Sequence, residues 1–171
     1  MQKLIAFDIE TTGLYPERGD RIIEIGAVPI VGTEVLLNCG FETLINPGIP
    51  ISPEISSING ITDEMVRHAP ALESVLPDFL QFIGDQPLIA HNAPFDVGFI
   101  SHYMRKSGAA AMKNPIIDTL ELSRKVFPHA RTHNLDALLQ RLHITYRSEQ
   151  RHRSMGDAYL TGLAYLKLLK L

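Results

Sequence analysis

The sequence predicts an α/β fold in which a mixed five-stranded sheet is flanked by helices. Two observations carry this prediction: an apolar run over residues 4–9 that would be buried on both faces of a strand, and an alternation of short β-rich and helical segments along the rest of the chain. Because 171 residues with 45% hydrophobic content can bury one sizeable core, we expect a single domain over residues 1–171.

The first half of the chain carries the predicted antiparallel strands. Two β-rich runs, 21–31 and 35–46, follow the first strand and are separated by Gly32-Thr33-Glu34, so the first three strands are expected to form an antiparallel meander. Cys39 falls in the second of these runs and is expected to fill the core. A proline-rich connection then leads to Ser52-Pro53-Glu54, which has the pattern of a helix start.

Helices and two further short strands alternate in the second half of the chain. Residues 71–83 show apolar residues at helical spacing, and Pro77 is expected to kink or shorten this helix. The remaining expected elements are strands at 87–91 and 116–118 and helices at 93–106, 119–127, 134–142 and 155–169. The resulting order, β-β-β-α-β-α-β-α-α-α, is typical of an α/β layer with a mixed sheet.

Composition narrows the class of protein. No segment approaches the ~20 apolar residues of a membrane span, so we expect a cytoplasmic protein with no membrane partner. A single cysteine rules out an internal disulfide and a cysteine-based zinc site. The net charge of −3 is unevenly spread, because residues 1–120 hold 7 Lys/Arg against 15 Asp/Glu, whereas residues 121–171 hold 9 against 4. This distribution is compatible with a polyanionic substrate.

Two acids stand at the end of the first predicted strand. Asp8 and Glu10 are two residues apart, so their side chains project to the same side of the strand. Burial of two like charges is tolerable only if a cation lies between them, which favours a metal site. The alternative is that the strand has ended and the acids are solvated, as is common at strand ends.

A second polar motif lies where the fourth strand meets a helix, at His91-Asn92-Ala93-Pro94-Phe95-Asp96. Asn92 is a good N-cap residue and Asp96 is a favoured acid of the first turn, so helix capping alone would explain both. In the functional interpretation, Asp96 points from the helix start toward Asp8. Asp118 also precedes a helix, and capping explains it fully.

The third motif opens the last helix, at His152-Arg153-Ser154-Met155-Gly156-Asp157. Ser154 and Asp157 have the spacing of a capping box, in which case His152 would be a solvated loop histidine. In the alternative interpretation, a histidine five residues before an acid aims both side chains at one site. The ordinary pKa of a histidine, about 6.5, suits a general base at neutral pH.

Taken together, Asp8-x-Glu10, Asn92-x-x-x-Asp96 and His152-x-x-x-x-Asp157 resemble, in order and placement, the motifs of the DEDDh (DnaQ-like) 3′→5′ exonucleases. The proofreading epsilon subunit of bacterial DNA polymerase III typifies this family. Four further stretches agree with it, at residues 22–27, 59–62, 117–120 and 134–138. The resemblance covers nearly the whole chain and implies a ribonuclease H-like fold.

The resemblance implies an enzyme that hydrolyses phosphodiester bonds from the 3′ end of single-stranded or frayed DNA and releases nucleoside 5′-monophosphates. It implies two divalent cations, Mg²⁺ or Mn²⁺, and hard carboxylate ligands without cysteine agree with that choice. The implied metal ligands are Asp8, Glu10, Asp96 and Asp157, and the implied general base is His152. Asp8 would bridge the ions, Glu10 and Asp157 would share the ion that activates water, and Asp96 would bind directly or through water.

The same resemblance implies a pocket for the 3′-terminal nucleotide. Its lining would be Thr11, Thr12, Gly13, Leu14, Asn92 and Phe95. Leu14 would wedge beside the base and Phe95 would add a stacking face. An ordinary turn after a strand would also explain Thr12-Gly13. The expected partners are single-stranded nucleic acid, DNA rather than RNA, and a DNA polymerase. The chain would be either a stand-alone nuclease or an excised domain of a larger polypeptide.

Three alternatives differ from this assignment. An exoribonuclease of the same family, trimming RNA 3′ ends or short oligoribonucleotides, would differ in its contacts to the 2′-hydroxyl. A haloacid-dehalogenase-like phosphatase would share an Asp-x-Glu-Thr stretch, but the lysine and the later acidic motif that it needs do not occur together. A non-catalytic nucleic-acid-binding module would have lost an acid or the histidine, and all five residues are present.

The polar segment 143–154 is expected to be a mobile lid. It contains Arg147, Arg151 and Arg153 around His152, with only Glu149 opposing them. Without a phosphate these cations would have no partner, so the segment is predicted to become ordered when metal and nucleotide bind.

Overall fold

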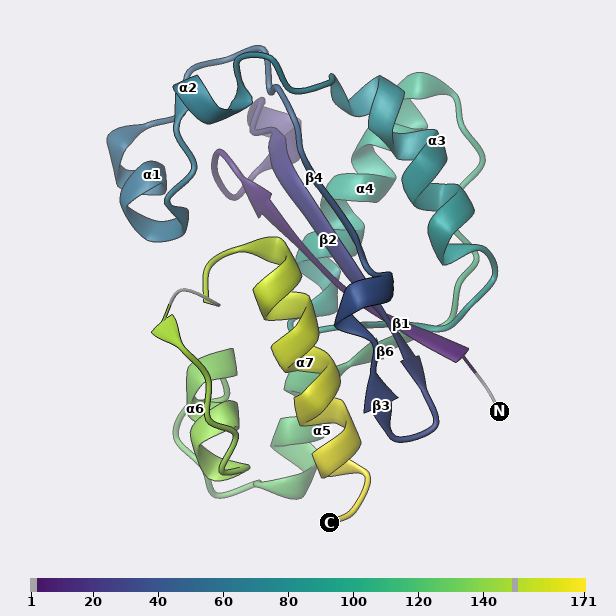
Figure 1. Cartoon of the computed structure of the whole chain (residues 1–171), viewed down its shortest axis with the longest axis vertical. Helices are drawn as coiled ribbons and strands as arrows, with labels where there is room; N and C mark the ends of the chain where they lie inside the picture. Colours follow the sequence, from purple (N-terminus) through teal and green to yellow (C-terminus); the bar gives the residue numbers. More distant parts are fainter. Residues whose placement is uncertain (1–2, 149–150) are drawn as a thin grey trace.

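The computed structural model describes residues 3–148 and 151–171, and a sheet runs through its centre with helices on both faces (Figure 1). The described strands follow the order β3-β2-β1-β5-β6, and β4 is also paired with β2. They are β1 (Lys3–Thr11), β2 (Ile22–Val31), β3 (Glu34–Val35), β4 (Phe41–Leu44), β5 (Leu88–Ala90) and β6 (Ile116–Asp118). The pairs among β1 to β4 are antiparallel, whereas β5 is parallel to β1 and β6, which confirms the predicted mixed sheet.

The helices follow the predicted order, with one short helix added. They are α1 (Pro53–Asn59), α2 (Asp63–Val66), α3 (Leu72–Ile83), α4 (Ala93–Ser107), α5 (Thr119–Val126), α6 (Leu135–Arg141) and α7 (Ser154–Leu168). The added helix is α2, whose N-cap Thr62 accepts a hydrogen bond from the Met65 N–H. Within the described residues, no helix is long and apolar enough to cross a membrane.

The predicted continuous strand 35–46 is wrong, because a 3-10 turn at Leu37–Cys39 separates β3 from β4. Pro29 of β2 accepts a hydrogen bond from the Leu36 N–H but has no N–H to donate in return, so pairing with β2 stops there. The turn takes Cys39 out of the sheet and leaves it exposed, which also corrects its expected place in the core.

Helix α3 runs from the N-cap residue Ala71 to the predicted end at Ile83 and is not shortened by Pro77. Its buried face holds it against the sheet, with Val75, Phe79 and Ile83 in the main hydrophobic core. This packing outweighs the one backbone hydrogen bond that proline removes.

The two faces of β1 are buried by different helices. Phe7 lies in a core cluster with Phe79 of α3 and with residues of α4, whereas Ala6 lies in a cluster with residues of α7. Because side chains alternate along a strand, Asp8 and Glu10 share the face that α7 covers. The predicted burial of this strand on both faces is confirmed.

The N-terminal end of α7 lies directly on β2, at Gly26. A Cβ atom built on Gly26 would lie 2.3 Å from the backbone nitrogen of Met155, so a side chain fits there only if the helix moves. Gly26 is also the cross-strand partner of Asp8. This close approach therefore brings the start of α7 to the carboxylates of β1.

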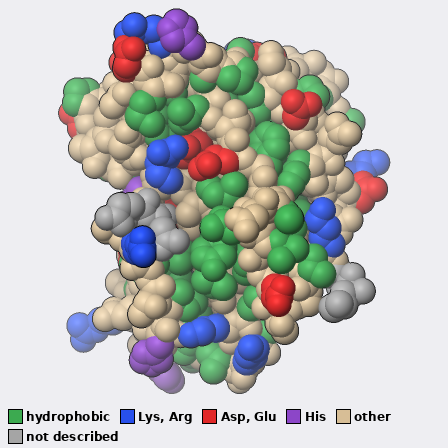
Figure 2. Space-filling view, in the orientation of Figure 1, with side chains coloured by type: hydrophobic (Ala, Val, Ile, Leu, Met, Phe, Trp, Pro, Cys, Tyr) green, Lys and Arg blue, Asp and Glu red, His purple; other side chains and the backbone are tan. Residues whose placement is uncertain are grey.

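The charge imbalance along the sequence does not form one basic patch on the face shown in Figure 2. Lys and Arg side chains lie there at separate places with apolar and neutral surface between them. Contacts to an anionic substrate on this face would therefore come from individual cations rather than from a broad basic surface.

Candidate active site

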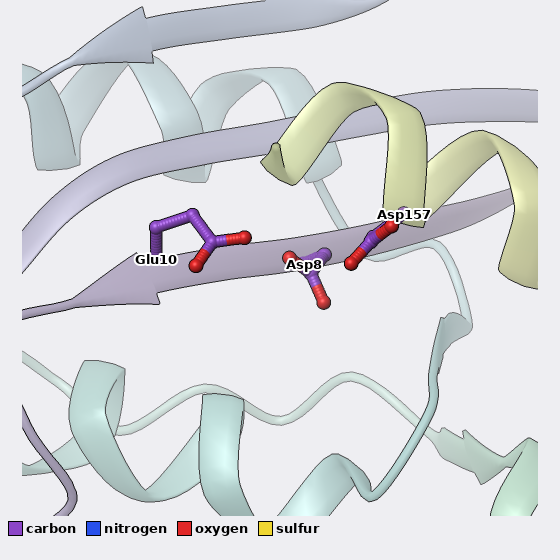
Figure 3. A group of neighbouring side chains, drawn as sticks. All are labelled: Asp8, Glu10 and Asp157. Carbon is purple, nitrogen blue, oxygen red and sulfur yellow. The ribbon is translucent and has the colours of Figure 1, made fainter. Parts of the chain in front are cut away.

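Three carboxylates converge beside β1. Asp8 and Glu10 of β1 and Asp157 of α7 each offer an oxygen, and these oxygens lie within 4.8 Å of one another. Figure 3 shows Asp8 between the other two side chains. Asp157 is buried, and the two strand acids are half-buried. Carboxylate oxygens at this spacing are suited to sharing hard divalent cations.

Burial and mutual repulsion raise the pKa of these acids. The pKa of Asp8 is well above its ordinary value, first because of burial and then because of Asp96, Glu10 and Asp157. Burial, followed by the charges of Asp157 and Glu24, raises the pKa of Glu10 to about 7. Burial also raises the pKa of Asp157. A group of acids that resists full ionisation on its own fits a site in which a cation supplies the opposing charge.

Asp96 is the fourth predicted acid and is buried in the first turn of α4. Its Oδ1 accepts a hydrogen bond from the Ile9 N–H at 3.0 Å, which ties the start of α4 to β1 between Asp8 and Glu10. Its charge raises the pKa of Asp8, so the two groups lie close enough to interact. Asp96 nevertheless is not one of the three acids whose oxygens converge.

The alternative that the Asn92 side chain caps the helix is wrong. Asn92 stands at the N-cap of α4 with a left-handed φ of 67°, and within the described structure its side chain makes no capping hydrogen bond. Its backbone N–H donates to Asp118 Oδ1 at 2.9 Å, and the same oxygen accepts from the Leu120 N–H. The predicted cap role of Asp118 is therefore confirmed, and the exposed Asn92 side chain is left outside this network.

The turn after β1 is built from its own polar groups. The Thr11 hydroxyl donates to the Gly13 carbonyl at 2.6 Å, and the Thr12 hydroxyl accepts from the Arg21 N–H at 2.9 Å. A Cβ atom on Gly13 would lie 2.4 Å from the Asp20 carboxyl group, so only glycine fits without displacing that side chain. These contacts fix the direction in which the chain leaves the strand.

Leu14 and Phe95 line the same cavity of about 300 Å³, together with His102 and Arg105 of α4. The Leu14 side chain is 64% exposed, so a large apolar group faces solvent at the cavity. Phe95 is half-buried and packs on Phe99 with 5.1 Å between ring centroids. The structure thus brings together the two side chains that were predicted to contact a base.

His152 precedes α7 in the left-handed region, with a φ of 61° and an exposed side chain. Its backbone N–H lies 3.3 Å from both carboxylate oxygens of Asp157. The capping-box alternative for Ser154 and Asp157 is wrong, because Ser154 is the first helical residue and Arg153 is the N-cap. The histidine and the acid of the third motif are therefore held beside each other.

Arg151 is paired with two carboxylates, one on α6 and one on α7. Its Nε lies 2.6 Å from Asp136 Oδ1 of α6, and its Nη1 contacts Asp157. The expectation that this cation has no partner without a phosphate is wrong, since its partners come from two helices packed nearby. The predicted mobility of segment 143–154 stays a prediction, and Glu149 lies outside the described residues.

Arg153 is also paired, with Glu24 of β2, which sequence reasoning missed. The Arg153 Nε lies 3.0 Å from both carboxylate oxygens of Glu24, and its Nη2 contacts one of them. Glu24 is fully buried. Glu24 could have been found from the sequence, because it is the one acid within the apolar run Ile22–Val31. An acid within an apolar run is also what identified Asp8 and Glu10 on β1.

The chain matches known exonucleases in sequence and in fold. A family model described as Exonuclease (RNase_T) matches residues 5–165. A DNA polymerase III subunit epsilon-like protein of Rhodobacter capsulatus is 44% identical over 165 residues, which cover 96% of this chain and 23% of that protein. The chain thus spans less than a quarter of the length of this curated relative.

Two solved structures share the whole fold. Exonuclease X in complex with 5′ overhanging duplex DNA has a TM-score of 0.77 at 26% identity, over 99% of this chain and 92% of that chain. The nuclease domain of 3′hExo, a DEDDh family member bound to rAMP, has a TM-score of 0.82 at 20% identity, over 99% of this chain and 92% of that chain. This second likeness concerns the fold alone. The chain therefore belongs to the RNase_T exonuclease family, and its fold is the ribonuclease H-like fold of the DEDDh exonucleases.

Proposed function

We propose that the chain is a metal-dependent 3′→5′ exonuclease that acts on single-stranded or frayed DNA ends and releases nucleoside 5′-monophosphates. The observation that carries this proposal is the convergence of Asp8, Glu10 and Asp157 next to His152. Membership of the exonuclease family supports the reaction class. The name of the Rhodobacter relative favours DNA as substrate and a DNA polymerase as partner.

Asp8, Glu10 and Asp157 would hold two divalent cations, Mg²⁺ or Mn²⁺, with Asp96 contributing directly or through water. When bound, such ions lower the pKa of the attacking water and stabilise charge on the phosphate and the leaving oxygen. Asp8 is the candidate bridging ligand, because Asp96, Glu10 and Asp157 all raise its pKa and therefore all lie near it.

His152 would act as the general base. Its exposed side chain can take a proton from water at the site, and the hydrogen bond from its backbone to Asp157 holds it beside the acids. The water oxygen then bonds to phosphorus while the bond between phosphorus and the 3′ oxygen of the preceding nucleotide breaks. That oxygen gains a proton and becomes the new 3′-hydroxyl end.

The cavity lined by Leu14 and Phe95 would accept the terminal base. Leu14 would wedge beside that base, and Phe95 would offer a ring to stack on. The backbone of Thr12 and Gly13 and the exposed Asn92 side chain would contact the terminal sugar and phosphate. The turn after β1 contributes Leu14 to the lining and would close this end of the cavity around a bound nucleotide, so a free chain end would be required.

The test uses four single strands of equal length: linear DNA with a free 3′-hydroxyl, the same DNA with a blocked 3′ end, a DNA circle, and RNA of the same sequence. With Mg²⁺ or Mn²⁺ we expect mononucleotide release from the free DNA end and none from the blocked strand or the circle. EDTA should stop the reaction. A circle cut as fast as the linear strand would exclude exonuclease action, and faster release from RNA would assign the chain to RNA ends instead.

A further inference from the structure

Glu24 is a buried acid outside the three sequence motifs. It lies on β2 directly opposite Glu10 in the register of the two strands, and none of its surface is exposed. Its charge raises the pKa of Glu10. A buried carboxylate next to another acid destabilises the fold unless a cation and hydrogen-bond donors neutralise it.

The start of α7 supplies both the cation and the hydrogen-bond donor that Glu24 needs. Arg153 places its Nε 3.0 Å from each Glu24 oxygen, and the Ser154 N–H donates to Glu24 Oε2 at 2.9 Å. In the described structure, the N-cap residue Arg153 makes no side-chain capping bond of its own. Glu24 therefore caps α7 from a different element, at the positive end of the helix dipole.

The residues that contact Glu24 lie between the two proposed functional residues of this segment, His152 and Asp157. Arg153 follows His152 directly, and Ser154 begins the turn of helix that presents Asp157. Asp157 in turn accepts the hydrogen bond from the His152 N–H. The two proposed functional groups are thus held by one continuous set of contacts that begins at Glu24.

We propose that Glu24 is a positioning residue of the site: through Arg153 and the Ser154 N–H, its carboxylate sets where His152 and Asp157 lie relative to Asp8 and Glu10. Its full burial keeps it away from substrate, so it acts through other residues. The expected effect on turnover rests on the proposed function, whereas the expected effect on cation binding requires only that Asp8, Glu10 and Asp157 hold a cation. Residues that orient metal ligands typically change metal affinity or activity by about 10- to 100-fold when replaced.

The test compares Glu24→Gln with the matched control Glu42→Gln. Glu42 is an exposed acid on β4 whose charge also acts on Arg153, but it is paired in register with Gly26 and not with Glu10. Mn²⁺ affinity is measured by calorimetry, and kcat and KM are measured on a linear oligonucleotide with a free 3′ end. For Glu24→Gln we expect Mn²⁺ affinity and kcat each to fall by about 10-fold or more with KM little changed. The control Glu42→Gln should keep the wild-type Mn²⁺ affinity, kcat and KM.

Three further variants separate positioning from loss of folding. Arg153→Met should reproduce the losses, and the double variant with Glu24→Gln should add little to either single change, because both remove the same interaction. Arg153→Lys keeps the charge without the planar fork, so it should lose less than Arg153→Met. These Arg153 variants decide the question if Glu24→Gln does not fold.

The outcomes are distinct. Wild-type Mn²⁺ affinity and kcat in folded Glu24→Gln and Arg153→Met, or a rise in KM alone, would overturn the positioning role. If the wild type degrades no nucleic acid, the proposed function fails, and the ratio of Mn²⁺ affinities still decides the role of Glu24. If the wild type binds no Mn²⁺, both proposals are overturned.

Discussion

The two halves of the candidate site are fixed in different ways. Asp8 and Glu10 belong to β1, which is paired along its length with β2 and on its other edge with β5. His152 and Asp157 lie at the start of α7, where ion pairs made by Arg151 and Arg153 hold the chain. The backbone of a central strand places the first pair, whereas charges from distant elements place the second. The helix half should therefore respond more strongly to the loss of a remote side chain.

The largest expected effect is in the strand half. Asp8→Ala should abolish hydrolysis, because Asp8 lies among all the other acids and is the candidate bridging ligand. It should also slightly raise the melting temperature of the metal-free protein, since one of several mutually repelling acids is removed. Nuclease assays in Mg²⁺ and thermal melts in EDTA check both effects. Hydrolysis above a blank without enzyme would contradict the role of Asp8.

In the helix half, His152→Ala should lower kcat by about 10²- to 10⁴-fold, as expected for loss of a general base. Oligonucleotide binding should change less, because the metal ligands are retained. The exposed His129 offers a matched control, and His129→Ala should keep wild-type turnover. Full activity of His152→Ala would show that another group takes the proton.

The pH dependence of stability should report on the buried acids of the site, and Glu10 of the strand half offers the clearest test. Because the pKa of Glu10 is raised from 4.5 to about 7, the folded metal-free protein binds a proton there that the unfolded chain releases. Its stabilisation is present below about pH 4.5 and is lost as pH rises through about 7. Melting temperatures in EDTA should fall across this range, and Glu10→Gln should flatten the fall. An unchanged slope in Glu10→Gln would assign the titration to other acids.

The smallest expected effect separates the two arginines beside His152. Arg151 contacts Asp157, so its charge competes with cations for that carboxylate. Arg151→Gln should therefore strengthen Mn²⁺ binding several-fold, because it removes a cation that a largely buried carboxylate now holds. Measured by calorimetry, the Mn²⁺ affinity should rise in Arg151→Gln and fall in Arg153→Met. Weaker binding in both variants would mean that Arg151 also serves to position Asp157.

The fold and the shared face of Asp8 and Glu10 could be predicted from the sequence, because both depend on local pattern. Acids within an apolar run identify Asp8 and Glu10, and the alternation of strands and helices predicts the mixed sheet. The break between β3 and β4 was missed because it arises from Pro29 on the neighbouring strand.

The helix half was predicted only in part, because its contacts join distant segments. His152 and Asp157 could be found as a motif, but Glu24 and Arg153 are 129 residues apart and neither has a local signature of the pair. This distance explains why Arg153 was expected to lack a partner, whereas the partners of Arg151, Asp136 and Asp157, lie close to it in the sequence and were overlooked. The left-handed backbone of Asn92 was not predicted, because an asparagine before a helix more often caps that helix with its side chain.

Gly26 sets how closely the start of α7 approaches the strand that carries Asp8. The start of α7 lies on the Gly26 backbone, opposite Asp8, with no room for a methyl group between them. Any side chain at this position would act as a spacer that lifts the helix and carries Asp157 away from Asp8. The radius of a cation held between Asp8 and Asp157 would therefore be limited by a residue that carries no charge and has no side chain.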